Sequence, residues 1–228
     1  MHGNWESETG HHSLAHKISS DDREEGTTNL EWILDNWISL GADPGKLNIG
    51  LAAFGRSFAL VDPDDHGYLA PATFITSGTI PVLLQPEAGN FTREPGFLSY
   101  YEVCQSLWTC CGWREVWLDE GKVPYAYGGN DWIGYNNVDS IIYKVSMAQS
   151  YGVGGLMWWS FDLDDFKVIS RSSITKSVGN RRSSRKLLNG PFQFIPSHQF
   201  QFFFFKSIFE YSNRYFHASG ILNQDGSF

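Results

Sequence analysis

One pattern occurs twice in this sequence: an amphipathic helix followed at once by an apolar strand. In the first copy, apolar residues recur at helical spacing over residues 30–40, and an almost wholly apolar run covers residues 47–54. In the second copy, the helical pattern covers residues 138–150 and the apolar run covers residues 156–161. Strands that alternate with helices form parallel sheets with helices as a cover. The sequence therefore predicts an α/β fold whose two strands are parallel neighbours, and the first of them is of the kind buried on both faces.

The ends of these two helices carry their own signals. Thr28 followed by Glu31 predicts a capping box at the start of the first helix. Asn137 or Asp139 starts the second helix, and Gly152 is placed to end it.

A segment of different character lies between the two helix–strand units. Residues 57–135 are rich in Gly, Pro and aromatic residues, with short runs typical of strands. Residues 124–127 and 131–135 flank Gly128-Gly129-Asn130, which predicts a β-hairpin. A short helix is expected over residues 97–104. We interpret about residues 57–135 as an inserted α+β module.

Charge and aromatic content change abruptly near residue 167. The chain has 228 residues and a net charge of −8, but residues 168–228 hold 8 basic and only 2 acidic residues. All 9 Trp lie at or before Trp159, whereas 10 of the 17 Phe lie at or after Phe192. This shift predicts two parts: residues 1–167, which contain both units, and residues 168–228, a basic linker and Phe-rich tail with no assignable fold.

Composition also limits the classes of function. The acidic balance argues against nucleic acid as a partner. No apolar run reaches the 18 residues or so that a membrane span needs. The first residues show neither the basic region nor the apolar region of a signal peptide.

Several segments of the first 167 residues match a known family in order and spacing. They are His2-Gly3-Asn4-Trp5, Phe54-Gly55-Arg56-Ser57-Phe58, the run from Gly96 to Cys104, Lys122-Val123-Pro124-Tyr125, and the run from Gly154 to Phe166. Together they resemble the C-terminal part of the catalytic domain of the family 18 glycoside hydrolases, the chitinases and chitinase-like lectins. The resemblance implies part of a (β/α)8 barrel, about strands seven and eight, with an α+β domain inserted after strand seven.

The same resemblance implies a chemistry that this sequence does not complete. In this family the N-acetyl group of the substrate is the nucleophile, and one Glu at the end of an Asp-x-x-Asp-x-Asp-x-Glu motif is the general acid. No segment of the 228 residues fits that motif, and the run Asp162-Leu163-Asp164-Asp165 is followed by Phe166 where Glu is needed. We therefore expect no catalytic residue, no cofactor and no metal in this chain, and no cleavage of glycosidic bonds by it alone.

Positions that contact sugar in the family are present. Trp159 matches the strand-eight Trp that forms the floor of the cleaved sugar's subsite, and Met157 is expected to line the same pocket. Arg56 matches an arginine that hydrogen-bonds to substrate, and Phe54 stands where the family usually has Tyr, so one hydroxyl contact is lost. By position alone, Trp159 and Met157 are also consistent with a barrel core, and Arg56 with a surface ion pair.

Two further site residues follow from the resemblance. Trp5 matches an aromatic residue on the leaving-group side of the cleft. Glu94 matches a polar cleft residue of the inserted domain, with looser spacing. The implied partners are chitin or N-acetylglucosamine oligosaccharides, with no nucleic acid and no membrane, and the implied location is extracellular.

Cysteine and histidine residues give weaker signals. Cys104 matches a family cysteine whose disulfide partner follows strand eight, but the sequence has no Cys there, and its pairing with Cys110 or Cys111 stays open. The cluster of His2, His11, His12 and His16 fits a polar loop better than a metal site, because no Cys or carboxylate completes a ligand set. Asn90-Phe91-Thr92 is a glycosylation acceptor if the chain is secreted.

Two function classes remain. The first is a chitinase-family chain whose hydrolytic function belongs to a complete enzyme. The alternative is a non-enzymatic protein that binds chitin or other oligosaccharides, as the inactive members of the family do. An in-frame catalytic motif upstream of Met1 would favour the first class.

Overall fold

A computed structural model of the chain describes residue 3 and residues 6–22, 26–73, 85–109, 112–165 and 193–194. Two helix–strand units frame this structure: α1 (Leu30–Ser39) precedes β1 (Asn48–Ala52), and α3 (Val138–Tyr151) precedes β8 (Gly155–Trp159). The other elements are η2 (Pro44–Lys46), β2 (Phe54–Leu60), β3 (Ala72–Thr73), β4 (Phe97–Ser99), α2 (Tyr100–Thr109), β5 (Arg114–Leu118), β6 (Val123–Gly128), β7 (Asp131–Gly134), η4 (Phe161–Leu163) and β9 (Gln193–Phe194).

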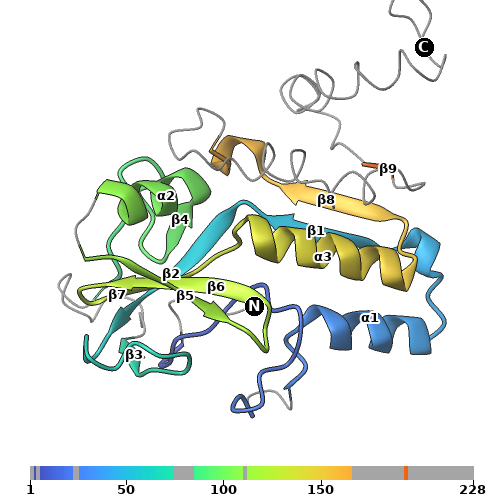
Figure 1. Ribbon diagram of the computed structural model, residues 1–228, viewed down its shortest axis with the longest axis horizontal. Coiled ribbons are helices and arrows are strands. Elements are labelled where there is room, and N and C mark those ends of the chain that lie inside the picture. Colours follow the sequence, from blue (N-terminus) through green and yellow to red (C-terminus); the bar gives the residue numbers. More distant parts are fainter. Residues whose placement is uncertain are drawn as a thin grey trace, which may run out of the picture.

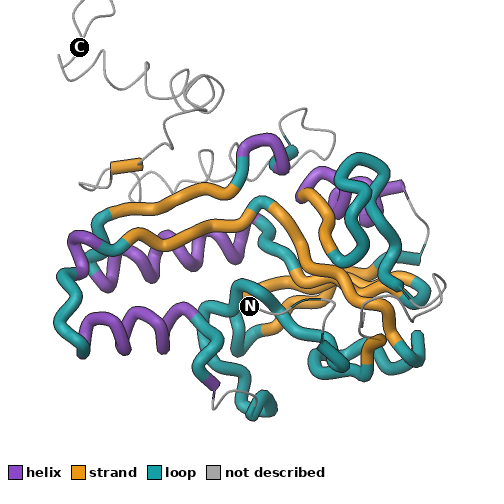
Figure 2. The backbone as a smooth tube through the Cα atoms, turned by 180° about the vertical axis from the view of Figure 1, so that it is seen from behind, coloured by secondary structure: helices purple, strands orange, loops and turns teal. Residues whose placement is uncertain are grey.

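The two predicted strands are parallel neighbours, which confirms the expectation from the repeated pattern. β1 pairs with β8 from Asn48 opposite Gly155 to Ala52 opposite Trp159, and β9 adds a third parallel strand beside β8. Both α1 and α3 lie on the same side of the β1–β8 pair (Figure 1). Figure 2 shows the same arrangement from behind. No helix in the described part of the chain combines the length and the apolar composition that crossing a bilayer requires.

The prediction that the first strand is buried on both faces is wrong. Burial alternates along β1, where Ile49 and Leu51 are buried but Asn48 and Gly50 are exposed. The same alternation occurs in β8, where Leu156 is buried and Met157 is exposed. Only the face toward the helices is covered within the described residues. Both faces of these strands carry apolar residues. Hydropathy alone does not distinguish an apolar face that packs in a core from one that is open to solvent, so the sequence did not show which face is exposed.

Helix α1 also departs from its predicted packing. Of the residues expected to form one apolar face, Leu34 is buried, but Ile33 and Trp37 are exposed. The predicted capping box of Thr28 and Glu31 is wrong as well. Asn29 is the N-cap, and its side chain accepts a hydrogen bond from the Trp32 N–H.

The predicted ends of helix α3 are confirmed. Asn137 caps the N-terminus in a reciprocal capping box with Ser140, and Gly152 ends the helix in the left-handed conformation at φ 65°. Ile141, Val145 and Ala148 from α3 join one core with buried residues of β1 and β8.

A close backbone approach fixes where β8 starts. The Gly154 N–H donates hydrogen bonds to the carbonyls of Pro44 and Leu47, over 3.0 and 2.9 Å. A Cβ atom at Gly154 would lie 2.1 Å from the carbonyl oxygen of Gly45, so a side chain is excluded there.

A mixed α and antiparallel β region fills the chain between β1 and α3. Its sheet has the strand order β3-β2-β7-β6-β5, with β4 also paired to β2. The predicted hairpin is confirmed as β6 and β7, which pair from Tyr125 opposite Gly134 to Gly128 opposite Asp131. The expected helix over residues 97–104 is shifted, because residues 97–99 form β4 and the helix begins at Tyr100. Since β2 begins two residues after β1 ends, this sheet adjoins the C-terminal end of β1 (Figure 1).

Candidate functional site

Trp159 and Met157 lie on the open face of β8. Trp159 is 59% exposed and Met157 is 40% exposed, whereas the adjacent Trp158 packs against the core on the opposite face. Gly50 of β1 stands directly opposite Met157, and a Cβ atom at Gly50 would be in van der Waals contact with the Met157 methyl group, at 3.4 Å. The result is a flat apolar surface with a large aromatic ring at its edge.

The end of β8 is tied to the start of β2. The Ala53 N–H donates a 2.7 Å hydrogen bond to the Trp159 carbonyl, and the Tyr100 N–H donates to the Ala53 carbonyl. After Trp159 the chain turns into η4, where the Ser160 hydroxyl donates to the Asp162 carboxylate. Trp159 is therefore the last strand residue, and it lies at the edge where β1 passes into β2.

Arg56 lies against two aromatic rings. Its guanidinium carbon is 5.7 Å from the centre of the Phe54 ring and 5.1 Å from the centre of the Phe97 ring, which suits cation–π attraction. The two rings are 5.1 Å apart, and Phe97 pairs with Arg56 across β4 and β2. The arginine is half-buried. These contacts hold the guanidinium against the two rings.

Two histidines continue the stack behind Phe54. The His12 ring stacks on Phe54 at 5.0 Å and on His11 at 5.2 Å. His11 is fully buried, with Nε2 within 3.1 Å of the Pro124 carbonyl and 2.9 Å of the Tyr135 carbonyl. Its Nδ1 accepts a hydrogen bond from the Ser13 N–H. These partners fit a neutral ring with its proton on Nε2, which anchors the N-terminal segment to β6 and β7.

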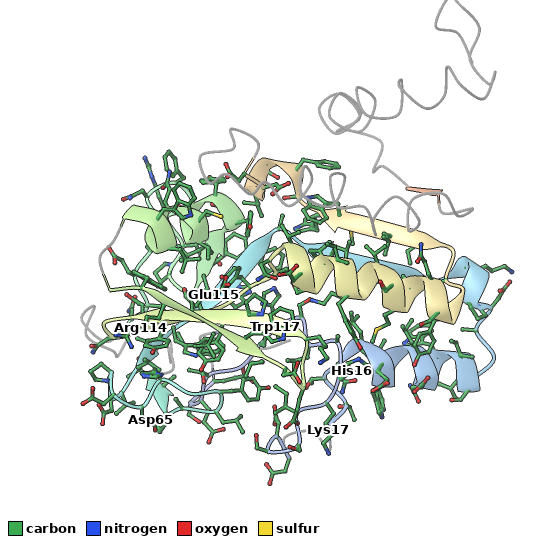
Figure 3. All side chains as sticks on the ribbon, in the orientation of Figure 1. His16, Lys17, Asp65, Arg114, Glu115 and Trp117 are labelled. Carbon is green, nitrogen blue, oxygen red and sulfur yellow. The ribbon has the colours of Figure 1, made fainter. Side chains whose placement is uncertain are left out.

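The remaining histidine of the described cluster has a different role. The His16 Nδ1 is 2.8 Å from the Glu31 carboxylate, and its Nε2 is 2.7 Å from the Tyr143 hydroxyl. Figure 3 shows His16 beside the start of α1, far from Glu115 on β5. Among the residues that the structure describes, no three His, Cys, Asp or Glu side chains are grouped to hold a metal ion. His2 lies outside the described residues.

Glu94 is exposed and lies next to the aromatic stack. The Phe97 N–H donates to the Glu94 carbonyl over 3.2 Å, so Glu94 is one short turn away from the ring that contacts Arg56. Trp5 lies outside the described residues. Of the six predicted site residues, Phe54 and Arg56 are in contact, Glu94 lies one turn from Phe97, and Met157 and Trp159 share the open face of β8, whose last carbonyl accepts a hydrogen bond from the Ala53 N–H.

A buried lysine lies beneath this surface, and sequence reasoning missed it. The Lys144 side chain is fully buried and donates hydrogen bonds to Ser13 Oγ, over 2.9 Å, and to Asn136 Oδ1. Asn136 in turn donates to the carbonyl of Ala52, the last residue of β1. Burial lowers the pKa of Lys144 from 10.5 to about 7. A signal was present, since Lys144 follows Ile141 by three residues and so shares its buried helix face.

Cys104 is buried in the main core, close to Tyr135. Burial and the nearby Glu115 carboxylate raise the pKa of Tyr135 well above 10. Cys110 and Cys111 lie outside the described residues. The pairing of the three cysteines stays as open as it is in the sequence.

The described α/β chain thus combines an exposed tryptophan at the C-terminal end of a parallel strand with an arginine that lies against two neighbouring aromatic rings. The profile of glycosyl hydrolases family 18 matches residues 1–164, which is most of the chain. This chain belongs to glycosyl hydrolases family 18, and membership implies an α/β fold of TIM-barrel type.

Curated relatives include chitinases and a glycoprotein. The chain is 38% identical over 169 residues to probable chitinase 10 of Drosophila melanogaster and 35% identical over 167 residues to the oviduct-specific glycoprotein of Sus scrofa. Each match covers 73% of this chain, but only 7% of the Drosophila protein and 28% of the pig protein. The chain therefore spans a minor part of the length of these relatives.

Solved structures show the same similarity. An immunomodulatory active chitinase from Trichuris suis is 34% identical with a TM-score of 0.65, covering 72% of this chain and 41% of the chitinase. Human YKL-39, described as a pseudo-chitinase with retained chitooligosaccharide binding, is 32% identical with a TM-score of 0.68, covering 83% of this chain and 48% of that protein. The solved structures that this chain resembles thus include a chitinase and a pseudo-chitinase with retained chitooligosaccharide binding.

Proposed function

We propose that this chain binds chitin-type oligosaccharides of N-acetylglucosamine through the open face of β8 and the adjoining aromatic stack. The observation that carries the proposal is the 59% exposure of Trp159 at the end of a strand whose other tryptophan packs into the core. An exposed indole face offers the apolar face of a sugar ring a large contact area at little cost in side-chain entropy. Met157 extends the same surface.

Polar recognition in this proposal comes from the antiparallel sheet. Arg56 supplies hydrogen-bond donors to sugar oxygens, and its contacts with Phe54 and Phe97 hold it ready. Glu94 supplies an acceptor near the same ring, and Trp5 supplies a second aromatic surface. The site then combines one stacking surface with a few fixed polar groups, as small-molecule sites do.

The proposal extends to architecture and location. β1 and β8 are assigned as strands seven and eight of a (β/α)8 barrel, with the region between β1 and α3 as the inserted domain. Barrel active sites form at the C-terminal ends of the strands, which is the end of β8 where Trp159 lies. The exposed face of Gly50 and Met157 then corresponds to the barrel interior. The assigned location is extracellular.

Hydrolysis is assigned to a complete family domain and not to these 228 residues alone. The general-acid motif is absent from this sequence. The similarity to a pseudo-chitinase that retains oligosaccharide binding supports a second candidate, a non-enzymatic sugar-binding role. Both candidates share the same binding surface.

Titration with the N-acetylglucosamine tetramer tests the binding proposal. We expect calorimetry to show binding by the unaltered chain and affinity at least about 10-fold weaker for Trp159→Ala, the loss typical of a central aromatic contact. Trp37→Ala is the matched control, because Trp37 is equally exposed but lies on α1. Equal affinities for the two variants, or no binding by the unaltered chain, would contradict the proposal. Mass spectrometry of the same mixture should show no shorter oligomers.

A further inference from the structure

We propose that Asn90 carries an N-linked oligosaccharide. Asn90-Phe91-Thr92 is the one Asn-X-Ser/Thr sequence in the 228 residues, so any N-linked glycan on this chain belongs there. Phe91 at the middle position and Arg93 after the threonine leave the acceptor free of the prolines that block modification. This inference depends on the proposed extracellular location, because the modification takes place only on chains that enter the secretory route.

The structure places the acceptor in an exposed turn. Asn90 is exposed and lies in the loop that leads to β4, and no hydrogen bond of its side chain to another described residue is found. The backbone of the next two residues is held by the side chain of Glu102. The Glu102 carboxylate accepts hydrogen bonds from the Phe91 N–H over 2.7 Å and from the Thr92 N–H over 3.1 Å. The loop is thus fixed by its backbone, and the amide that would be modified is left to solvent.

The surroundings of Asn90 suit a sugar. Phe91 is 63% exposed, and its ring meets Tyr101 edge-on at 5.5 Å. A sugar on the neighbouring residue has an apolar ring within reach, and covering it removes apolar surface from water. α2 and β4, which follow this loop, lie at the end of the molecule opposite α1 (Figure 1). A bulky group there does not interfere with the core of α1, α3 and the parallel strands.

The modification itself is an ordinary group transfer. The Asn90 Nδ2 forms a bond to C1 of an oligosaccharide carried on a lipid pyrophosphate, the bond from C1 to the pyrophosphate oxygen breaks, and Nδ2 gives up one proton to a base of the transferase. The lipid pyrophosphate leaves. In the folded loop, the Thr92 hydroxyl donates to the Phe97 carbonyl over 3.1 Å. Because the transferase has to reach this hydroxyl, we place the modification before the loop folds, during synthesis.

Secretory expression of the full chain tests the inference. The 228 residues follow a cleavable secretion signal in cultured mammalian cells, and chains are collected from both medium and cells. We expect digestion with peptide N-glycosidase to lower the mass of the chain and to leave Asp at position 90, as read by mass spectrometry of the peptide. Asn90→Gln should abolish this change, and Thr92→Ser should retain it. Asn130→Gln, at an exposed asparagine outside any acceptor sequence, is the matched control and should retain it too.

The outcomes separate this inference from the proposed function. Since the signal supplies entry to the secretory route, an unmodified Asn90 in these chains overturns the inference whatever the natural location is. A glycan on Asn90 supports the inference even if the N-acetylglucosamine tetramer does not bind to the chain. A glycan that persists in Asn90→Gln would also overturn it.

Discussion

The Nζ atom of Lys144 donates a 2.9 Å hydrogen bond to the Oγ atom of Ser13 in the interior of the protein. Lys144 Nζ also donates a hydrogen bond to the amide oxygen of Asn136. Within the described residues, both of its hydrogen-bond acceptors are therefore neutral oxygens. Burial disfavours the charged form, and the pKa of Lys144 is lowered to about 7. This contact connects the N-terminal segment, α3 and the end of β1 through one titratable group.

The first prediction concerns pH. The unfolded chain keeps the lysine pKa near 10.5, so between about pH 7 and pH 10 it binds more protons than the folded chain. The free energy of unfolding should therefore rise with pH across this window, and the contribution of Lys144 should be constant below it. Urea unfolding of the unaltered chain and of Lys144→Met at several pH values checks this. The variant should lose the slope, and parallel profiles for the two proteins would contradict the prediction.

The second prediction concerns the carboxylate that holds the Asn90 loop. Burial raises the pKa of Glu102, but hydrogen bonds from Phe91, Ser99 and Thr92 outweigh it, and the net pKa lies below 4.5. Glu102→Gln keeps the shape and removes the charged acceptor, so we expect a loss of about 2 kcal/mol in the free energy of unfolding at neutral pH. The loss should shrink as the pH falls through the lowered pKa, since protonation then weakens the unaltered site as well.

Glu120→Gln is the control for this prediction. The Glu102 carboxylate accepts four hydrogen bonds, whereas the Glu120 carboxylate accepts two, from the Ser19 N–H and hydroxyl, at an exposed position. Because water replaces such contacts at the surface, little change is expected. Equal losses for the two glutamates would show that the buried position of Glu102 does not matter.

The third prediction concerns the end of α3. Gly152 has φ 65°, a conformation that side chains with a Cβ adopt with strain, so Gly152→Ala should cost about 1 kcal/mol of stability. Gly67→Ala is the matched change. Gly67 lies outside the left-handed region with open space around it, and alanine there should be neutral or slightly stabilising. Thermal unfolding measures the stability of both variants. If Gly67→Ala lost as much stability as Gly152→Ala, the prediction would be contradicted.

The fourth prediction concerns Arg56 and depends on the proposed sugar site. Arg56→Lys keeps the positive charge but removes the flat group that lies against Phe54 and Phe97. We expect several-fold weaker binding of the N-acetylglucosamine tetramer by calorimetry. Arg114→Lys, at an exposed position of β5, should leave the affinity unchanged (Figure 3). An unchanged affinity for Arg56→Lys would remove Arg56 from the proposed site.

The sequence was sufficient for features set by local chemistry. The C-cap of α3 at Gly152 and the β6–β7 hairpin depend on a few neighbouring residues and were predicted, and Asn137 was one of the two N-caps that the sequence left open. The parallel pairing of β1 and β8 followed from the alternation of helices with strands.

Features set by distant contacts could not be predicted. The open face of β8 is invisible to hydropathy, because Met157 and Trp159 are as apolar as residues of a core. The position of Lys144 on the buried face of α3 could be read from the sequence, but its hydrogen bonds to Ser13 and Asn136 come from segments outside the helix and could not. The arrangement of Arg56 over Phe97 required the pairing of β2 with β4, which no local signal specifies.

The close approach of Gly154 to the carbonyl of Gly45 also determines which tryptophan faces outward. It places Gly155 opposite Asn48 at the first position of the strand pair. A shift by one residue would exchange the two faces of β8, so that Trp158 would become accessible and Trp159 would point into the core. Trp158 and Trp159 carry the same side chain, and the glycine at position 154 determines which of the two is exposed. Mutations at Gly154 should therefore weaken sugar binding at the proposed site, although Gly154 is not one of the residues assigned to that site.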